Sequence, residues 1–517
     1  MLLDYIIILL YALGMVAIAI VTHNRSKSVN DFLLAGKKGL NGWMSAFAYG
    51  TTYFSAVIFI GYAGKFGFTF GLAAVWIGIG NAILGSLVAW KLLAKKTKNM
   101  TSRLQAKTMP EFFEKRFDSS SLKIVSAIII FIFLIPYSAS VYNGLSSLFE
   151  TVFNIDGWIV MLALAVLTAL YLFFGGYFAT ALSDFIQGII MIIGVVLMVV
   201  FFLKSPEVNW DISDLTSNDN LAWFTFNNSN KGLYGATASL LSLILLTSLG
   251  VYGLPQTVHK YYAVRDKKSI NQGIIVSTVF ALIIGFGAYF VGALSPLFLS
   301  ADQVQQLGGY DYVIPNLLAK IIPTGLIGII AVLILSASMS TLSSVSLTSA
   351  SVIAVDLYKG KLNKKASDKQ VNVRMRILCL VFVAISLILA VLNEYYKLAA
   401  IAYMMGLSWG VLAGCFIGPF VYSLYSRKVT KTSCWWSIIG TLVLTIFLII
   451  FFGYDSVGWN CTFSQAIQNG VGCSPMIGVI CMIYSLIVTP IVSVFTRKPS
   501  QEVLGNAFDK KIENEII

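Results

Sequence analysis

Long apolar stretches, one after another along the whole chain, constrain the fold of this sequence more than any other feature. Each is close to the roughly 20 residues that an α-helix needs to cross a membrane. Of the 517 residues, 57% are hydrophobic and 11% are charged, whereas soluble domains carry about 25% charged residues. This excludes a water-soluble globular enzyme and predicts an all-α polytopic membrane protein with about thirteen transmembrane helices. The stretches are 2–22, 43–64, 72–94, 121–147, 157–176, 184–204, 236–258, 271–298, 324–355, 375–393, 399–423, 434–453 and 474–494.

The positions of the basic residues predict how the chain is oriented. The formal net charge is +13, and all but five of the 36 Lys and Arg residues lie in, or at the edge of, alternate gaps between the apolar stretches. This is the positive-inside pattern. We therefore expect a plasma-membrane protein with its N-terminus outside and its C-terminus in the cytoplasm. The basic excess then reflects topology and indicates no nucleic-acid partner. The five exceptions are Lys65, Lys204, Lys231, Lys320 and Lys397.

Motifs for enzymatic or metal chemistry are missing from the sequence. There is no G-x-x-x-x-G-K-[ST] phosphate loop, so an ion gradient rather than ATP would have to drive uphill transport. The two histidines and six cysteines form no metal-ligand pattern. We therefore expect no enzyme activity and no cofactor. Cys461 and Cys473 share one external loop, where a disulfide and two free thiols stay open alternatives.

One acidic residue, Asp184, lies at membrane depth. It stands between Gly175-Gly176 and the apolar run that begins at Phe185. A carboxylate within the bilayer is costly, which makes it a functional candidate. The alternative is that Asp184 only caps the helix that follows it, and its position alone favours neither interpretation.

A hydroxyl-rich segment forms the centre of the stretch 324–355. In a helix, Ser340, Thr341 and Ser344 fall on one face, with Ser343 beside Ser340. Hydroxyl and carbonyl oxygens can replace the water shell of an alkali cation. The density of hydroxyls therefore favours an ion site over the close helix packing that small residues permit. Packing is the better interpretation for Ser336, Ser338 and Ser346.

Two stretches look interrupted, 43–64 at Thr51–Ser55 and 236–258 at Thr247–Pro255. Glycine, proline and short polar residues let a membrane helix unwind where the freed backbone lines a cavity. These are the second and seventh stretches, so two inverted repeats of five would place the breaks at equivalent positions, next to the binding site. The predicted organisation is one transporter domain (1–517) made of an N-terminal helix and loop (1–42), a first repeat (43–204), an inverted second repeat (236–423), two C-terminal helices (424–496) and a cytoplasmic tail (497–517).

Four motifs between about residues 31 and 425 together point to a family. They are Trp43 leading into Thr51–Ser55, Thr108–Phe113 with Arg116-Phe117, Tyr171–Gly176 followed by Ser183–Gly188, and Met339–Ser344 running to Asp356–Tyr358. With these motifs the chain resembles the sodium/solute symporter family. The resemblance implies a leucine-transporter-like core of two inverted five-helix repeats, with Na+ as the coupling ion. It also implies a sodium site that uses the carbonyls of Thr51, Phe54 and Ala337 and the hydroxyls of Ser340 and Thr341.

The resemblance also bears on the solute. In the sodium/proline branch an aspartate stands where this chain has Tyr53, whereas Thr52–Ala56, Gly253–Thr257 and Asp311–Pro315 look more like the pantothenate branch. We therefore expect a sodium-coupled symporter that imports, by alternating access, a small carboxylate such as pantothenate or a monocarboxylate. Proline or another amino acid is the alternative, and a passive channel or uniporter is the alternative of a different class.

Solute contacts are expected where the two breaks face each other. A tyrosine there would supply an aromatic wall and a hydroxyl that needs a partner when buried. No basic residue lies within the predicted core spans, so hydroxyls, helix N-termini or sodium itself would have to hold an anion. The candidate contacts are Thr52, Tyr53, Ser55, Thr247 and Tyr252.

A second sodium is predicted beside the first. Some members of the family that the chain resembles place one next to the aspartate of the sixth span, and the resemblance implies the same set here: Asp184, Ser340, Thr341, Ser343 and Ser344. The expected partners are a small-molecule solute, sodium and the lipid bilayer, and the chain is expected to function as a monomer.

Overall fold

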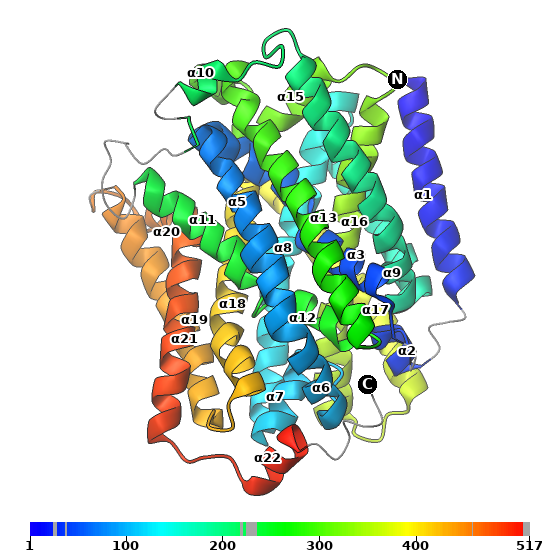
Figure 1. Cartoon of the computed structure of the whole chain (residues 1–517), viewed down its shortest axis with the longest axis vertical. Helices are drawn as coiled ribbons and strands as arrows, with labels where there is room; N and C mark the ends of the chain where they lie inside the picture. Colours follow the sequence, from blue (N-terminus) through cyan, green and yellow to red (C-terminus); the bar gives the residue numbers. More distant parts are fainter. Residues whose placement is uncertain (24–27, 37–38, 218–220, 224–234, 458, 510–517) are drawn as a thin grey trace.

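The computed structural model describes residues 1–517 except 24–27, 37–38, 218–220, 224–234, 458 and 510–517, and within that part the chain is helical (Figure 1). Lys231 and the last eight residues of the predicted tail lie outside the described residues. The long helices are α1 (Leu2–Thr22), α8 (Ser120–Phe153), α9 (Gly157–Lys204), α13 (Lys267–Leu294), α16 (Ile327–Ser351), α17 (Asp368–Tyr396), α18 (Ile401–Tyr425), α19 (Lys431–Asp455) and α21 (Ser474–Phe495). The shorter α-helices include α2 (Val29–Leu34), α3 (Gly42–Tyr53), α5 (Val75–Gly80), α6 (Lys95–Leu104), α7 (Met109–Phe117), α11 (Ala236–Gly250), α12 (Pro255–Tyr262), α15 (Val313–Ile321), α20 (Phe463–Gly472) and α22 (Gln501–Phe508). Wider π-helical turns form η2 (Ile58–Gly67), η4 (Asn81–Val88), η5 (Trp90–Ala94) and η8 (Val352–Leu362), and a 3-10 turn forms η7 (Tyr310–Tyr312).

Eleven helical segments of the described chain have the length and apolar composition to cross a membrane. The all-α polytopic fold is therefore confirmed, but the count of thirteen is not. The stretches predicted at 157–176 and 184–204 are the two parts of the helical run α9, which Gly176 divides with non-helical backbone angles (φ 67°, ψ −170°). Glycine tolerates a positive φ at little cost, so two helices meet in a kink at Gly176, and the run counts once among the eleven although each part is long enough to cross a membrane.

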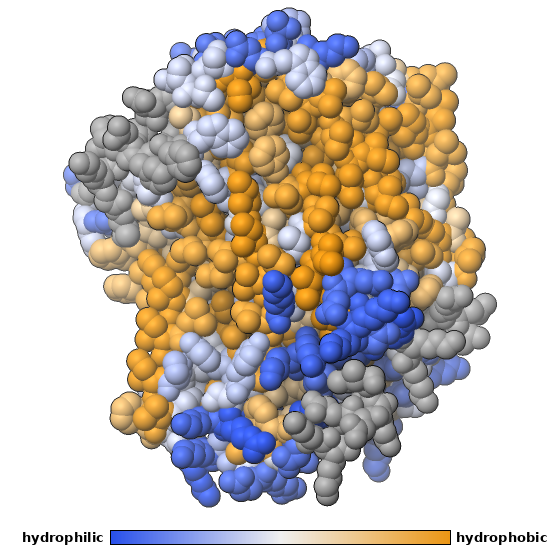
Figure 2. Space-filling model, viewed as in Figure 1, coloured by the Kyte–Doolittle hydropathy of each residue, from blue (hydrophilic) through white to orange (hydrophobic). Residues whose placement is uncertain are grey.

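The surface has the polarity expected of a chain that sits in a bilayer. Figure 2 shows apolar residues over most of the middle of the visible face, and hydrophilic residues gathered at its upper end and in its lower part. The lower part includes the lysine-rich helix α6 and the C-terminal helix α22, whereas the N-terminus lies at the upper end (Figure 1). Apolar side chains such as Val443, Ile446 and Phe447 of α19 are more than half exposed, which a lipid environment accommodates.

Both predicted helix interruptions are confirmed. Helix α3 ends at Tyr53, and Phe54 adopts extended backbone (φ −104°, ψ 102°) before the helix resumes. Helix α11 ends at Gly250 and α12 begins at Pro255, with Leu254 extended between them. Since an unwound turn frees carbonyl and amide groups inside the bundle, these two places need polar partners or ligands.

Helix α16 lies inside the bundle, with every residue except Ile329 buried. It packs against α1, α3, α8 and α9. Its serine and threonine hydroxyls therefore face protein rather than lipid. The two C-terminal helices α19 and α21 pack on α18, and Cys461 and Cys473, beside α20, are free thiols.

Candidate functional site

The residues predicted to hold sodium meet where α16 crosses the end of α3. The Ser340 hydroxyl donates to the carbonyl of Thr51 at 3.0 Å and lies 3.1 Å from the carbonyl of Ala337. The Thr341 hydroxyl lies 3.5 Å from the same Thr51 carbonyl. Four of the five predicted residues thus share one buried cluster, which we call the hydroxyl cluster (Thr51, Ala337, Ser340 and Thr341).

The fifth residue, Phe54, stands at the break itself. Its amide N–H closes the last turn of α3 on Gly50, and no hydrogen bond among the described residues ties it to the hydroxyl cluster. The cluster offers only oxygen atoms, which are the ligands that hard cations prefer. Carbonyls freed at a helix break are used for sodium in transporters built this way, so the cluster fits a sodium ion.

A second polar cluster lies one helical turn further along α16. The Lys260 ammonium donates to the Ser344 hydroxyl at 2.8 Å and lies 3.6 Å from a carboxylate oxygen of Asp184. The Ser344 hydroxyl is also 2.8 Å from that of Thr52. We call Thr52, Asp184, Lys260 and Ser344 the charged cluster, and all four are buried.

The order of donors in the charged cluster follows from the proton count. Thr52 donates its single hydroxyl proton to the carbonyl of Ala48 at 2.7 Å. Ser344 must then donate to Thr52, because each hydroxyl has one proton and two lone pairs. The remaining lone pairs of Ser344 face Lys260, so this hydroxyl already acts as a ligand for a cation.

Asp184 is not a helix cap. It lies eight residues beyond the bend at Gly176, well inside α9, and its side chain is fully buried. A cap must sit at the first turn, where backbone N–H groups lack helical partners, so the capping interpretation is wrong. Neither oxygen of Asp184 receives a hydrogen bond from the described residues, and the neighbouring charge is Lys260.

The prediction that the core spans contain no basic residue is wrong, because Lys260 is buried among them. The apolar stretch 236–258 stops just before it, which placed Lys260 in a cytoplasmic gap. In the structure it lies on α12 and only 2% of its side chain is exposed. The sequence did contain one signal for this position. Proline favours the first position of a helix, and a helix that began at Pro255 would have to continue past residue 258, and so past Lys260, to make more than one turn.

The predicted second sodium set is divided between the two clusters. Ser340 and Thr341 face Thr51, while Asp184 and Ser344 contact Lys260. Ser343 stays within α16 and donates to the carbonyl of Ser340 at 3.0 Å. A second sodium at these residues remains a prediction.

Two of the solute candidates, Tyr53 and Thr247, join the two broken helices. The Tyr53 hydroxyl at the end of α3 donates to the carbonyl of Thr247 in α11 at 2.8 Å. The Thr247 hydroxyl lies 2.7 Å from the side-chain oxygen of Asn81, and Tyr252 donates to the carbonyl of Leu84 at 2.9 Å. Ser55 accepts from the amide of Val57 across the first break. Thr52 contacts Ser344 of the charged cluster instead.

An aromatic wall surrounds Tyr53. Its ring stacks on that of Trp409 with centroids 6.1 Å apart and meets Tyr49 edge-on at 6.1 Å. A Cβ at Gly85 would lie 2.1 Å from the Tyr53 hydroxyl, so only glycine leaves room for it. Asn81, Gly85 and Trp409 were not predicted, because single residues in apolar stretches carry no pattern of their own.

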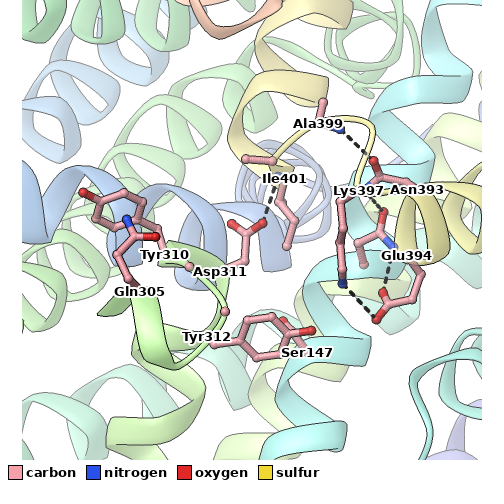
Figure 3. Close-up of a pocket in the computed structure, with 14 residues that line it drawn as sticks. Ser147, Gln305, Tyr310, Asp311, Tyr312, Asn393, Glu394, Lys397, Ala399 and Ile401 are labelled. Carbon is pink, nitrogen blue, oxygen red and sulfur yellow. Dashed lines mark hydrogen bonds and ion pairs between the residues drawn. The ribbon is translucent and has the colours of Figure 1, made fainter. Parts of the chain in front are cut away.

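A separate cavity of about 380 Å³ lies between η7 and the loop that follows α17 (Figure 3). Asp311 accepts there from the backbone N–H of Ile401 at 3.2 Å, and Lys397 pairs with Glu394 at 3.8 Å. Burial raises the pKa of the Asp311 carboxyl above its usual range. These residues are distinct from both clusters on α16.

Known proteins resemble the chain over most of its length. The model of the sodium:solute symporter family matches residues 32–441. The osmoregulated proline transporter OpuE of Bacillus subtilis is 30% identical over 82% of this chain and 84% of its own. The sodium/proline symporter of Escherichia coli is 29% identical over 84% and 86%.

One solved structure matches nearly the whole fold. A Na+-coupled sialic acid symporter, in a substrate-bound outward-open state, has a TM-score of 0.76 at 17% identity, covering 96% of this chain and 99% of that one. At this identity the similarity concerns the fold alone, and it confirms the predicted leucine-transporter-like architecture.

Proposed function

The chain belongs to the sodium:solute symporter family, and from this premise we propose that it imports proline, or another small neutral amino acid, together with sodium. The family and these relatives are transporters rather than enzymes. The observation that carries the choice of solute is the set of relatives that match most of the chain, which are proline transporters. They favour the amino-acid alternative over the carboxylate that the short motifs suggested.

The charge of the site supports the same choice. Asp184 and Lys260 lie 3.6 Å apart and carry opposite charges, so the charged cluster adds no net charge near the breaks. The groups around Tyr53 are hydroxyls, carbonyls and aromatic rings. A neutral zwitterion suits such a site better than an anion, which would need a cation to balance its charge.

The way the two sites are joined supports coupling between sodium and solute. Thr51 contributes to the hydroxyl cluster, and Tyr53, two residues on, contacts Thr247 across the breaks. A sodium ion at the hydroxyl cluster would fix the end of α3 against α16 and thereby the position of Tyr53. Sodium and solute would then strengthen each other's binding by the same factor, because coupling free energies are reciprocal.

The rest of the proposal concerns the setting. The chain acts in the plasma membrane as a monomer. Its N-terminus is outside and its C-terminus is in the cytoplasm, as the positive-inside pattern predicts. Neither an organic cofactor nor a nucleic-acid partner is part of the proposal.

Uptake into proteoliposomes tests the function. Radiolabelled proline, pantothenate and pyruvate are offered to the purified protein with an inward sodium gradient, and with choline in its place as the control. We expect proline to accumulate only with sodium, and pantothenate and pyruvate to stay at the level of protein-free liposomes. Proline entry that reaches equal concentrations without accumulation would contradict the proposal and indicate a uniporter.

A further inference from the structure

The feature behind this inference is the buried ammonium of Lys260. It stands between the Asp184 carboxylate and the Ser344 hydroxyl, at 3.6 Å and 2.8 Å, and lies 5.2 Å above the ring of Tyr177. A carboxylate, a hydroxyl oxygen and an aromatic face are each attractive to a cation. Lys260 therefore occupies a site with the chemistry of a cation-binding site.

We propose that the Lys260 ammonium is a built-in cation that takes the place of a second coupling sodium, so that the chain binds one sodium ion for each solute. A sodium ion on Asp184 and Ser344 would have to sit beside the ammonium. Two like charges at such a distance repel strongly where water is scarce. The inference rests on the proposed function only in taking sodium as the coupling ion.

Two observations make Lys260 suited to this role. Its ammonium is tethered to α12, the second half of a broken helix, whereas its partners lie on α9 and α16. Ser344 also bonds to Thr52 of α3, the other broken helix. The ammonium thus joins the four elements around the breaks, as a bound sodium would, but it cannot leave with the solute.

The hydroxyl cluster lacks any such tethered charge. Among the described residues its hydrogen bonds run only between hydroxyls and carbonyls of α3 and α16. It therefore keeps its capacity for a sodium ion from solution, one turn of α16 away from Ser344, which Lys260 contacts.

Equilibrium binding of ²²Na+ to the purified full chain, counted per molecule, tests the inference. We expect one sodium ion per wild-type chain and two in Lys260→Met, where the ammonium is removed and its volume is largely kept. Lys260→Met with Asp184→Asn should return to one, because the carboxylate that attracts the second ion is gone. The matched control is Lys123→Met, since Lys123 is also buried and lies near Glu114 (2.7 Å) and Asp356 (3.9 Å), and it should bind one.

Each possible count of bound sodium ions either supports or overturns the inference. Two sodium ions per wild-type chain, or one in Lys260→Met, would overturn the inference while leaving sodium-driven proline uptake intact. A wild-type chain that binds no sodium would overturn the proposed function as well. If Lys260→Met does not fold, the wild-type count still decides between one ion and two.

Discussion

The hydroxyl cluster and the charged cluster lie one turn apart on the same helix, yet they differ in whether a positive charge is already present. The hydroxyls of Ser340 and Thr341 contact the carbonyl of Thr51, so the hydroxyl cluster presents only neutral oxygens. Ser344 shares its hydroxyl with Thr52 and with an ammonium that is already neutralised by Asp184. The first cluster can take a cation from solution, whereas the second already holds one.

The difference shows that a row of similar hydroxyls on one helix does not define one site. What each hydroxyl does depends on the residue that faces it from another element: a backbone carbonyl of α3 for Ser340, and a lysine of α12 for Ser344. The following substitutions test this contrast, beginning with the largest expected effect.

Removing the built-in cation should have the largest effect, and on stability. In sodium-free buffer, Lys260→Met leaves the buried Asp184 carboxylate without its charge partner, which costs about 3–5 kcal/mol. We expect the free energy of unfolding in detergent to fall by that amount. Adding Asp184→Asn should restore most of it. Equal stability of the single and double variants in the absence of sodium would show that the pair contributes nothing.

Removing a ligand from the hydroxyl cluster should have the next largest effect, and on sodium dependence. A hydrogen-bonding or coordinating group that contacts a charge contributes about 1.5–3 kcal/mol, so Ser340→Ala should raise the half-saturating sodium concentration at least about tenfold. Thr341→Ala should act in the same direction. Ser338→Ala is the control, because its hydroxyl bonds to Ile334 within α16. Sodium curves that coincide for Ser340→Ala and wild type would place the ion elsewhere.

A smaller effect is expected at the solute site. Tyr53→Phe loses one neutral hydrogen bond, to the Thr247 carbonyl, worth about 0.5–1.5 kcal/mol. The KM for proline should rise between about twofold and tenfold, while the sodium response of uptake changes little. Tyr62→Phe is a matched control, because the buried Tyr62 hydroxyl has no hydrogen-bond partner among the described residues. An unchanged KM in Tyr53→Phe would remove this residue from the solute site.

The smallest effect is expected at Ser343. Its hydroxyl bonds within α16 and belongs to neither cluster, so Ser343→Ala removes no contact to either cluster and should change the half-saturating sodium concentration by less than about twofold. A change as large as that of Ser340→Ala would bring Ser343 into a second sodium site and break the contrast between the clusters.

Much of the fold was predictable from the sequence because membrane depth imposes a length on apolar helices. The breaks at Phe54 and Leu254 were also predictable, since glycine, proline and short polar residues mark them. The number of separate helical runs was not predictable, because a hydropathy pattern does not show that the two helices on either side of Gly176 meet in a kink without a loop between them.

The site was predictable only as far as residue chemistry and the family resemblance reach. Ser340, Thr341 and Asp184 stand out because hydroxyl density and an intramembrane carboxylate are unusual. Lys260 does not, because a lysine next to an apolar stretch is normally assigned to the adjoining loop. Its burial depends on where α12 ends and on a carboxylate 76 positions away in the sequence.

The accumulation ratio at steady state tests the central claim most directly. In proteoliposomes held at zero membrane potential, a tenfold inward sodium gradient supplies about 1.4 kcal/mol for each sodium ion that crosses. With one sodium per solute, wild-type protein should concentrate proline about tenfold and no further. Accumulation approaching about a hundredfold under the same gradient would mean two sodium ions per solute, and would contradict the assignment of Lys260 as the built-in second cation.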